Sequence, residues 1–532
     1  MRILGISQNH NASICLIEDG EIKLHCENER LSGRKHHAKA YDLLDTIKDS
    51  IDYLVISGFS PNKKYNQDYE KYLKDKGFKF KTINVWSSHH MFHASHAFYN
   101  SGFDKALSIA IDGMGSEYYF NNDNDLKDGY GREQRATFVA EYPNNFTEID
   151  KDVVVNFKYD GTNDHVKVSN DVSEGQLFEM TSSRLGFTPF DAGKVMALAA
   201  YGKNRKYHIV GNQDLYDISN LQKPKLNIEF GDSIQNVYDF CGDLQRQCQE
   251  NVLQYIKDKV VQTGITKVCL SGGYFLNCVA NHFYKDNLDG IELYIEPVAT
   301  DAGQSIGIAK YFWHNLNNDT TIRKQKSIYY GYERKYDNNV ISTQFKDFEV
   351  LKADEKVVAA ELRKKKLIGV YGQKSESGPR ALGNRSLLFD PTVNNGKDIV
   401  NKTKKREPFR PFACSMKEEC LHEYFDTKLD SSPFMMYAMK TKVSRDIIPA
   451  VLHIDDTCRV QTVNKKQHEH LYNIIDEFEK ISGVPMVLNT SFNLAGNPIV
   501  ETITDVYNTF KDSDIDCLYF YETKQLIRKL DK

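Results

Sequence analysis

The sequence predicts a two-domain α/β protein, and three observations support this. The chain has 532 residues, more than one ordinary domain contains. Its character changes near Asp337, where a second set of strand and helix patterns begins. Short apolar runs that end in Asp-Gly or Gly-Gly turns recur in the first part, at residues 3–20, 107–113 and 267–273. Such turns let backbone N–H groups approach phosphate closely, which favours a nucleotide-binding α/β fold.

The first domain is predicted to open with a hairpin. Apolar strands at residues 3–6 and 13–17 lead into Asp19-Gly20, a strong turn signal, and then into a strand at 21–26. Helical periodicity follows at 175–185 and 234–259.

Polar composition marks the expected loops. Residues 121–180 are rich in turn formers, and 121–131 is the clearest loop. A polar stretch at 313–327 is predicted to be a linker, so the domains are expected at 1–335 and 336–532. The second domain has buried-strand candidates at residues 367–371, 485–488 and 517–520.

Composition excludes several classes of protein. The formal net charge of −4 gives no global attraction to nucleic acid. No apolar run approaches the roughly 20 residues that span a bilayer, and no signal pattern opens the chain. The ten cysteines form no C-x-x-C pair and are expected to be reduced and buried. The sequence therefore predicts a cytoplasmic protein, or one of the host cytoplasm if its source is viral.

Histidines gather at residues 88–96. In a helix, His89 and His93 lie at i and i+4 on one face, the spacing that two imidazoles need to share a metal. Asp112 and Asp301 each occupy a turn after an apolar run. Two imidazoles and two carboxylates suit iron, zinc or manganese better than calcium. The histidine pair taken alone leaves a solvated or core position open.

The second domain carries an unusual basic constellation. Glycines flank two arginines in the string from Gly378 to Ser386. Further basic and polar groups lie among prolines and aromatics at 404–412, 457–461 and 489–493, which indicates fixed positions rather than a solvated tract. Arginine forks bind phosphate oxygens in a bidentate manner, and lysine adds a compact charge. The pattern predicts a phosphate-rich ligand.

These motifs resemble those of the O-carbamoyltransferase family, which includes nodulation protein U and the cephalosporin and tobramycin carbamoyltransferases. The string Gly-Pro-Arg-Ala-Leu-Gly-Asn-Arg-Ser at 378–386 is its most specific part. The resemblance covers nearly the whole chain, in order, through residues 5–13, 29–30, 89–93, 193–199, 271–273, 378–386, 406–412, 457–461 and 489–493.

The resemblance implies an N-terminal domain of the actin/sugar-kinase (ASKHA) type, similar to TsaD, and a C-terminal domain similar to YrdC. It implies that ATP and carbamoyl phosphate form carbamoyl-adenylate in the C-terminal domain, with Mg²⁺ beside ATP. The N-terminal domain then transfers the carbamoyl group to an acceptor hydroxyl, with a divalent metal, Fe²⁺ first and Zn²⁺ or Mn²⁺ as alternatives.

Site residues follow from the same resemblance. The expected metal ligands are His89, His93, Asp112 and Asp301. The expected contacts to carbamoyl phosphate and ATP are Arg380, Arg385, Lys404, Arg406, Arg410, Arg459 and Ser491. The expected nucleotide contacts of the first domain are Lys194, Gly272, Gly273 and Asn277. Asp191 is the expected base for the acceptor hydroxyl, and His10 and Lys35 are expected near the carbamoyl group.

Other functions stay open at this stage. A phosphotransferase or a tRNA-modifying enzyme could use the same N-terminal fold, but a kinase does not need a second anion site. A non-catalytic ATP-gated module does not need the His89/His93 pair. The acceptor is expected to be a small molecule such as a sugar, an antibiotic or a toxin precursor. A hydroxymethyl-pyrimidine, free or in phage-type DNA, is the alternative, and a homodimer stays open.

Overall fold

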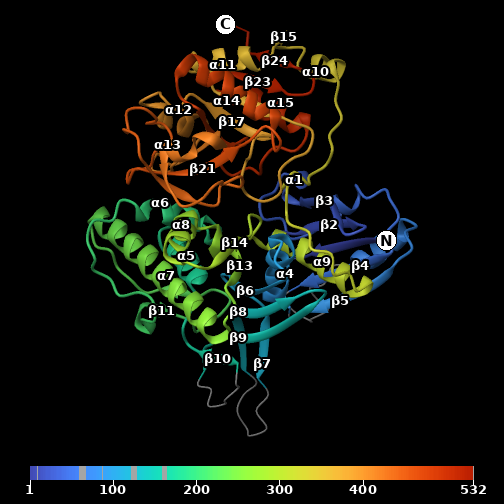
Figure 1. Ribbon diagram of the computed structural model, residues 1–532, viewed down its shortest axis with the longest axis vertical. Helices are drawn as coiled ribbons and strands as arrows, with labels where there is room; N and C mark the ends of the chain where they lie inside the picture. Colours follow the sequence, from blue (N-terminus) through green and yellow to red (C-terminus); the bar gives the residue numbers. More distant parts are fainter. Residues whose placement is uncertain (9, 59–67, 87, 121–128, 158–164, 531–532) are drawn as a thin grey trace. The chain divides into compact units, whose positions relative to one another are not determined.

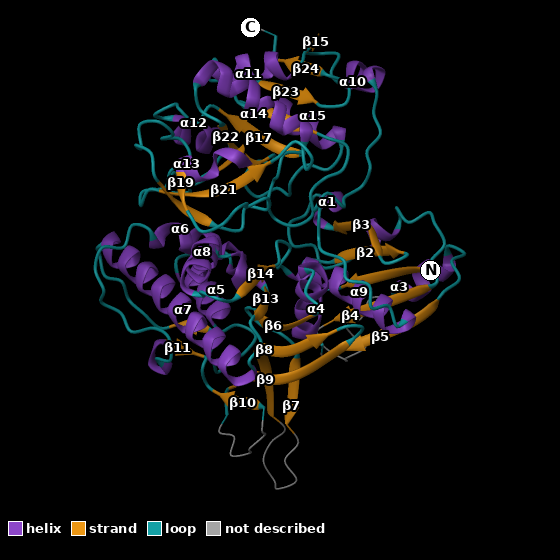
Figure 2. Ribbon diagram, viewed as in Figure 1, coloured by secondary structure: helices purple, strands orange, loops and turns teal. Residues whose placement is uncertain are grey.

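A computed structural model describes residues 1–532 except 9, 59–67, 87, 121–128, 158–164 and 531–532 (Figure 1). The chain forms two compact units. The first contains Met1–Asn28 and His36–Lys326, and the second contains Glu29–Lys35 and Ser327–Lys532. Both units combine helices with sheets (Figure 2), which confirms the predicted α/β class. The boundary at residue 335 stays a prediction.

The first sheet of the first unit contains the predicted hairpin. Its strands lie in the order β3-β2-β1-β4-β5, in which β3, β2 and β1 are antiparallel and β1, β4 and β5 are parallel. Ile3, Leu4 and Ile6 of the central strand are fully buried. The bounds are β1 Arg2–Ser7, β2 Ser13–Glu18, β3 Glu21–Glu27, β4 Tyr53–Gly58 and β5 Lys81–Trp86.

The second sheet repeats this topology. In the order β9-β8-β6-β13-β14, the first three strands are antiparallel and the last three parallel. Strand β10 adds to β9 in parallel, and β7 pairs with β8 antiparallel. The bounds are β6 Lys105–Ile111, β7 Glu117–Phe120, β8 Gly129–Glu141, β9 Asn145–Val155, β10 Val166–Ser169, β13 Lys267–Ser271 and β14 Glu292–Ile295. This duplicated sheet is the architecture that the resemblance to actin and sugar kinases implies.

The prediction of a turn-rich segment at 121–180 was wrong for much of its length, because β8 and β9 cross it. Arg135 and Asp152 are cross-strand partners and form an ion pair. Charged side chains that pair across a ladder keep the strands polar, so polarity did not mark a loop here. Most of the predicted loop at 121–131 lies outside the described residues.

Helices cover both sheets of the first unit. The predicted helices at 175–185 and 234–259 correspond to α5 and α7. The predicted linker at 313–327 was wrong at its start, because α9 continues to Asn317 and buries Trp313. The bounds are α2 Tyr41–Leu44, α3 Tyr69–Asp75, α4 His89–Ser101, α5 Glu174–Arg184, α6 Ala192–Ala199, α7 Ile234–Thr263, α8 Cys278–Asn287 and α9 Gln304–Asn317. The short pair β11 Tyr216–Asp217 and β12 Lys225–Leu226 lies between α6 and α7.

Helices α4 and α9 hold the two sheets of the first unit together. Helix α4 packs on β6 and β13 of the second sheet, α9 packs on β1 and β2 of the first, and the helices contact each other (Figure 1). The approach is close at Gly307, where an added Cβ would lie 2.1 Å from the Phe92 carbonyl oxygen. At Gly5 of β1, a Cβ would lie 2.7 Å from the Ser305 carbonyl oxygen. Glycine at these two positions permits the backbones to touch.

The second unit is built on one ten-stranded sheet in the order β15-β24-β23-β16-β17-β22-β18-β21-β20-β19. Leu387 and Phe389 of β17 join one apolar cluster and Leu388 joins another, so both faces of the sheet are buried. The strands are β15 Glu349–Lys352, β16 Ile368–Tyr371, β17 Arg385–Phe389, β18 Ala413–Lys417, β19 Phe425–Asp426, β20 Ala438–Thr441, β21 Thr457–Val463, β22 Met486–Ser491, β23 Cys517–Phe520 and β24 Gln525–Arg528. The helices are α10 Asn338–Gln344, α11 Glu355–Arg363, α12 Gly396–Thr403, α13 Leu421–Tyr424, α14 Glu469–Ser482 and α15 Ile503–Lys511.

One early segment belongs to the second unit. Residues Glu29–Lys35, which contain α1 (Glu29–Ser32), group with it. The buried Arg30 donates from Nη2 to the Gly378 carbonyl oxygen at 2.9 Å. This bond ties the segment to the loop of the Gly-Pro-Arg motif.

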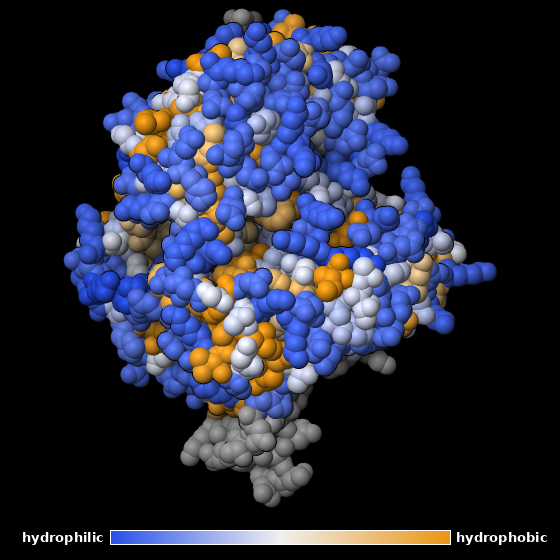
Figure 3. Space-filling model, viewed as in Figure 1, coloured by the Kyte–Doolittle hydropathy of each residue, from blue (hydrophilic) through white to orange (hydrophobic). Residues whose placement is uncertain are grey.

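The surface is largely hydrophilic and the cysteines are buried, as the amino-acid composition predicts. Hydrophilic residues predominate on the face drawn in Figure 3. The large apolar side chains that are exposed, such as Val261 and Ile234, are scattered along the chain. All ten cysteines are free and buried, as predicted. Within the part of the chain that the structure describes, no helix is long and apolar enough to cross a membrane.

The close contact at Gly307 predicts the effect of a single methyl group. Gly307→Ala should lower the free energy of unfolding by about 1–3 kcal/mol, because the Phe92 carbonyl cannot move without shifting α4. Gly193→Ala is the control: it lies in α6 with no atom near its added Cβ, and alanine favours helix by up to about 1 kcal/mol. Denaturant unfolding measures the stability of both variants. If Gly307→Ala unfolded at the same denaturant midpoint as the unaltered protein, the close contact between α4 and α9 would be refuted.

Candidate metal centre and anion site

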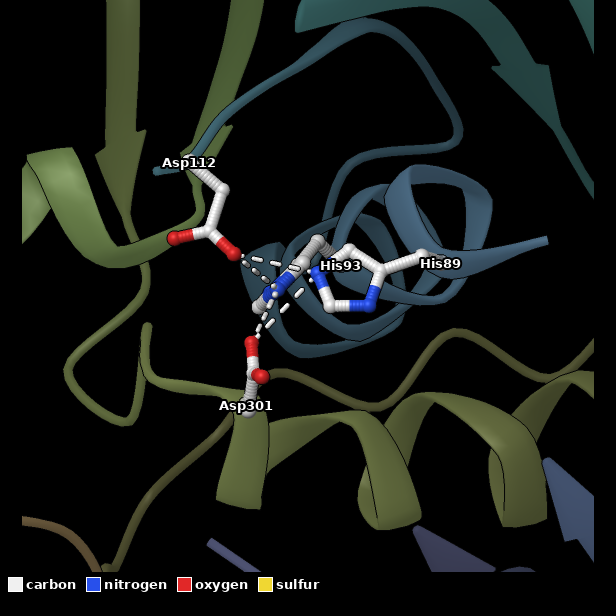
Figure 4. Close-up of side chains that lie close together, drawn as sticks. All are labelled: His89, His93, Asp112 and Asp301. Atoms are coloured by element: carbon white, nitrogen blue, oxygen red, sulfur yellow. Dashed lines mark hydrogen bonds and ion pairs between the residues drawn. The ribbon is translucent and has the colours of Figure 1, made fainter. Parts of the chain in front are cut away.

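Four side chains meet at one point in the first unit. One ligand atom from each of His89, His93, Asp112 and Asp301 lies within 4.8 Å of the other three, and all four residues are buried (Figure 4). Figure 4 shows both imidazoles on one helix, with the two carboxylates approaching from separate chain segments. Residues far apart in sequence therefore present two nitrogen and two oxygen donors to one small volume.

Each donor is positioned by the end of a regular element. His89 and His93 occupy the first two turns of α4, and their ring centroids lie 4.9 Å apart, as the i, i+4 spacing predicts. Asp112 follows the last residue of β6. Asp301 opens the 3-10 turn Asp301–Gly303, directly before α9. The crossing of α4 and α9 thus brings the donors of both sheets together.

Three of the four donor distances fit a bound divalent ion as they stand. Asp112 Oδ2 lies 3.0 Å from His89 Nε2 and 3.7 Å from His93 Nε2. Asp301 Oδ1 lies 3.4 Å from His89 Nε2 and 3.3 Å from His93 Nε2. Donors about 2.0–2.2 Å from a common ion are separated by about 3.0–3.5 Å from one another. The set of two imidazoles and two carboxylates suits iron, zinc or manganese.

The charges at this point also favour a cation. Burial opposes ionisation of Asp112, but its bonds to His89 and His93 outweigh burial and hold its pKa well below the usual range. Burial lowers the pKa of His89. Burial acts in the same sense on His93, yet Asp112 and Asp301 outweigh it and raise the pKa of His93 to about 9. The two carboxylates therefore attract positive charge to the imidazoles.

The predicted nucleotide loop of the first domain lies beside Asp112. The Gly273 N–H donates to Asp112 Oδ1 at 3.0 Å. Gly272 has φ +98°, and a Cβ there would lie 2.2 Å from the Ile111 carbonyl oxygen, so only glycine fits. Asn277 caps α8 by accepting from the Ala280 N–H at 3.1 Å. The loop and the candidate metal ligand Asp112 thus share a hydrogen bond.

His10 lies beside the Asp301 carboxylate, and Asp191 follows the aromatic residue that stacks on His10. His10 Nδ1 lies 3.4 Å from Asp301 Oδ2, and its ring stacks on Phe190 at 4.7 Å between centroids. Asp191, the neighbour of Phe190, accepts from Thr188 Oγ1 at 2.8 Å, and Lys194 Nζ lies 3.4 Å from it. Partial burial opposes ionisation of Asp191, but these partners outweigh it and lower its pKa. Asp191 is therefore a carboxylate at neutral pH.

Two further residues lie at the candidate metal site and were not predicted from the sequence. Gln304 Nε2 lies 3.0–3.2 Å from both imidazoles and 3.1 Å from Asp301 Oδ1. Gln304 follows Asp301 by three residues at the start of a helix, and this spacing could have indicated that both side chains lie on one face. Burial, then the charges of Asp112 and Asp301, raises the pKa of Glu179 to about 8. No sequence motif marks Glu179.

The other histidines of the cluster face away from the donors. His90 Nδ1 lies 2.6 Å from Glu133 Oε2, and His96 Nε2 lies 3.3 Å from Glu296 Oε1, with all four side chains buried. Each therefore contacts a buried carboxyl group of the first unit.

Basic side chains gather in the second unit around Lys404. Lys404 is buried and donates from Nζ to Asn493 Oδ1 at 3.0 Å and to the carbonyl oxygen of Ser491. Burial, then Arg406, Arg410 and Lys35, holds its pKa well below the usual range. The positive charges are therefore close enough to repel one another.

Arg406 belongs to the same cluster. Its guanidinium lies 4.1 Å from the Phe412 ring centroid, and Nη2 donates to the Pro411 carbonyl oxygen at 2.9 Å. Burial, then Arg410 and Arg459, holds its pKa well below the usual range. A bound anion would relieve this repulsion, so the cluster has the charge of a phosphate site.

The predicted arginines Arg380 and Arg385 differ in their surroundings. Arg385 is fully buried, its guanidinium lies 3.7 Å from the Tyr371 ring centroid, and it donates to the carbonyl oxygens of Asn384 at 2.9 Å and Glu501 at 3.3 Å. The Arg385 guanidinium is therefore hydrogen-bonded to backbone carbonyl oxygens of the protein. Arg380 is half-buried in the preceding loop.

Known proteins share both halves of this chain. The family models "Carbamoyltransferase N-terminus" and "Carbamoyltransferase C-terminus" match residues 54–310 and 359–528. Nodulation protein NolNO of Sinorhizobium fredii is 31% identical, over 96% of this chain and 78% of that protein. Nodulation protein NolO of Bradyrhizobium diazoefficiens is 29% identical, over 81% and 77%.

A solved structure of full-length HypF in its phosphate- and nucleotide-bound form covers 60% of this chain and 56% of its own, with 16% identity and a TM-score of 0.35. This likeness is too distant to add to the topology described above. The two family models, which together span most of both units, are decisive. The chain belongs to the carbamoyltransferase family and is an enzyme that transfers carbamoyl groups.

Proposed function

We propose that this carbamoyltransferase makes carbamoyl-adenylate from carbamoyl phosphate and ATP and passes the carbamoyl group to an acceptor hydroxyl. The observation that carries the proposal is the convergence of His89, His93, Asp112 and Asp301 beside the glycine loop. The cation cluster around Lys404 gives the same chain a second site, suited to phosphates. A single kinase-type reaction would need only one of them.

The first stage belongs to the cation cluster. Water cleaves carbamoyl phosphate to carbamate and phosphate, and a carbamate oxygen then attacks the α-phosphorus of ATP. Pyrophosphate leaves, with Mg²⁺ beside ATP, and the product is a mixed anhydride with a good leaving group. Lys404, Arg406, Arg410 and Arg459 neutralise charge on the phosphoryl oxygens during this step. Lys35 and Ser491 lie in the same surroundings, as the influence of Lys35 on Lys404 and the Lys404–Ser491 bond indicate.

The second stage belongs to the first unit. His89, His93, Asp112 and Asp301 would hold a divalent ion, with Fe²⁺ as our first choice, and when bound it would supply Lewis-acid stabilisation of the departing phosphate. Asp191 takes the proton of the acceptor hydroxyl, whose oxygen attacks the carbamoyl carbon, and AMP leaves. His10 and Lys194 orient the reacting groups beside Asp301 and Asp191.

We propose a small molecule with a free hydroxyl as the acceptor and the cytoplasm as the place of reaction. The test is to incubate the protein with ATP, carbamoyl phosphate and a panel of sugars, antibiotics, hydroxymethylated nucleotides and DNA. Mass spectrometry should find one added carbamoyl group, and AMP and pyrophosphate should depend on carbamoyl phosphate. AMP release that is independent of carbamoyl phosphate would contradict the proposal.

The metal site predicts one bound divalent ion per chain. His93→Ala should remove this ion, because only three of the four donor side chains remain. The affinity for the metal should fall by about 100-fold. His96→Asn is the matched control, since His96 lies on the same helix but faces Glu296. Elemental analysis after dialysis measures the ion, and thermal melting shows that each variant is folded. Equal metal content in His93→Ala and the unaltered protein would refute this assignment.

The cation cluster predicts where adenylate forms. Lys404→Ala and Arg459→Ala should abolish carbamoyl-phosphate-dependent exchange of labelled pyrophosphate into ATP, because the phosphates lose their counter-charges. Lys402→Ala, an exposed lysine two residues away, is the control and should leave the exchange unchanged. His93→Ala should retain the exchange and lose carbamoyl transfer. Loss of exchange in His93→Ala would contradict the division between the two units.

The lowered pKa of Asp191 predicts a base that is ionised throughout the neutral range. Asp191→Asn should slow carbamoyl transfer by about 100-fold or more, because general-base catalysis contributes that much, and should not alter pyrophosphate exchange. Asp214→Asn, an exposed aspartate of the same unit, serves as control. A transfer rate unchanged in single-turnover assays with Asp191→Asn would remove Asp191 from the mechanism.

A further inference from the structure

A network of buried polar side chains joins three neighbouring strands of the second unit. Its members are Ser415 of β18, Gln461 of β21 and Asn489 of β22, each at most 2% exposed. Ser415 and Gln461 are cross-strand partners, and Ser415 Oγ donates to Gln461 Oε1 at 2.6 Å. The same hydroxyl accepts from Asn489 Nδ2 at 2.7 Å. The hydrogen bonds therefore run without a break from β22 through β18 to β21.

This network bonds to the two residues that follow Arg380 in the loop of the Gly-Pro-Arg motif. Since the amide oxygen of Gln461 already accepts within the network, its amide nitrogen faces the Leu382 carbonyl oxygen, 2.9 Å away. The amide nitrogen of Asn489 lies 3.3 Å from the Ala381 carbonyl oxygen. The backbone directly after Arg380 is thus bonded to side chains of β21 and β22.

Further side chains hold the same stretch of backbone. Tyr329 Oη donates to the Leu382 carbonyl oxygen at 2.9 Å, so both lone pairs of this oxygen are used. The Leu382 N–H donates to Glu376 Oε1 at 2.6 Å. Tyr521 Oη donates to the Gly383 carbonyl oxygen at 2.9 Å. A loop whose backbone is bonded on so many sides has little freedom to move when a ligand binds.

The strands that hold the loop also carry residues of the cation cluster. Arg459 precedes Gln461 by two positions in β21, and Ser491 follows Asn489 by two positions in β22. Side chains two positions apart in a strand point to the same face of the sheet. Arg459 contributes to the repulsion within the cation cluster, and Lys404 donates to the Ser491 carbonyl oxygen. One pair of strands thus sets the place of both the loop and the cation cluster.

The chemistry of arginine explains why a fixed loop matters here. Arg380 is partly exposed and the preceding Pro379 is exposed, in contrast to the fully buried Arg385. A guanidinium binds phosphate oxygens through a planar fork of N–H groups, which tolerates little displacement. A backbone that is in place before the ligand arrives also lowers the entropy that binding costs.

We propose that Gln461 is a positioning residue for Arg380. Its bond to the Leu382 carbonyl oxygen sets the loop so that the Arg380 guanidinium meets a phosphate oxygen of the bound substrate. Ser415 and Asn489 orient the Gln461 amide and do not touch the ligand. This inference rests on the proposed anion site and deepens it, because it makes the loop a fixed wall of that site.

The test is a double-mutant cycle between Gln461 and Arg380, measured by exchange of labelled pyrophosphate into ATP. Arg380→Ala identifies which KM, that for ATP or that for carbamoyl phosphate, depends on this arginine. Gln461→Met keeps the length of the side chain but cannot donate, so it should raise the same KM about tenfold and leave kcat within about twofold. In the Arg380→Ala protein, Gln461→Met should raise that KM no further. Gln525→Met is the control, at a buried glutamine of β24 that bonds to Ser342, and should match the unaltered protein.

The outcomes separate the positioning role from the proposed reaction. An equal rise of that KM in the Arg380→Ala protein would overturn the positioning role, because Gln461 would then act through the fold or through another cation. Arg380→Ala with both KM values unchanged would overturn it as well. Calorimetric titration with ATP and with carbamoyl phosphate repeats the cycle without a reaction. Affinities that follow the cycle in a protein without exchange would support the positioning role and contradict the proposed reaction, whereas an unaltered protein that binds neither compound would overturn both.

A second variant covers a folding defect, which thermal melting identifies. If Gln461→Met does not fold, Tyr329→Phe repeats the cycle, because it keeps the ring and removes one hydroxyl that bonds to the Leu382 carbonyl oxygen. Tyr329→Phe should raise the same KM about threefold and have no effect in the Arg380→Ala protein. Equal effects of Tyr329→Phe in both proteins would overturn the positioning role.

Discussion

The crossing of α4 and α9 is the constraint on which the first site depends. One helix carries two imidazoles and packs on the second sheet, and the other follows the Asp301 turn and packs on the first. Gly307 permits their backbones to touch at the Phe92 carbonyl. Because the contact leaves no space for a side chain, the donors are held together by packing and do not need the ion to bring them near one another.

The two candidate sites use opposite electrostatic arrangements. At His93 the buried carboxylates raise the pKa of the imidazole, so negative charge is in excess until a cation enters. At Lys404 burial, followed by the charges of Arg406, Arg410 and Lys35, lowers the pKa of the amine, and a bound anion would offset this repulsion. Burying like charges costs stability, and binding of the complementary ligand offsets that cost. Such strained charge clusters are typical of functional sites.

The sequence predicted correctly those features that depend on residues close together in the chain. The hairpin around Asp19-Gly20 and the His89/His93 spacing each depend on residues a few positions apart. The strands β8 and β9 were missed because their charges pair across the ladder, as Arg135 does with Asp152. The meeting of Asp112 with Asp301 is set by the parallel strands between them, so spacing could not predict it and family resemblance did. Gln304 was missed because its one local signal, the spacing of three residues from Asp301, has value only once Asp301 is known to lie at the site.

Anomalous diffraction from crystals grown with Mn²⁺ or Fe²⁺ tests the central claim most directly. The account predicts one strong peak at the metal edge, about 2.0–2.2 Å from donor atoms of His89, His93, Asp112 and Asp301. A saturated crystal with no peak among these four side chains, or with its ion held by other residues, would contradict it.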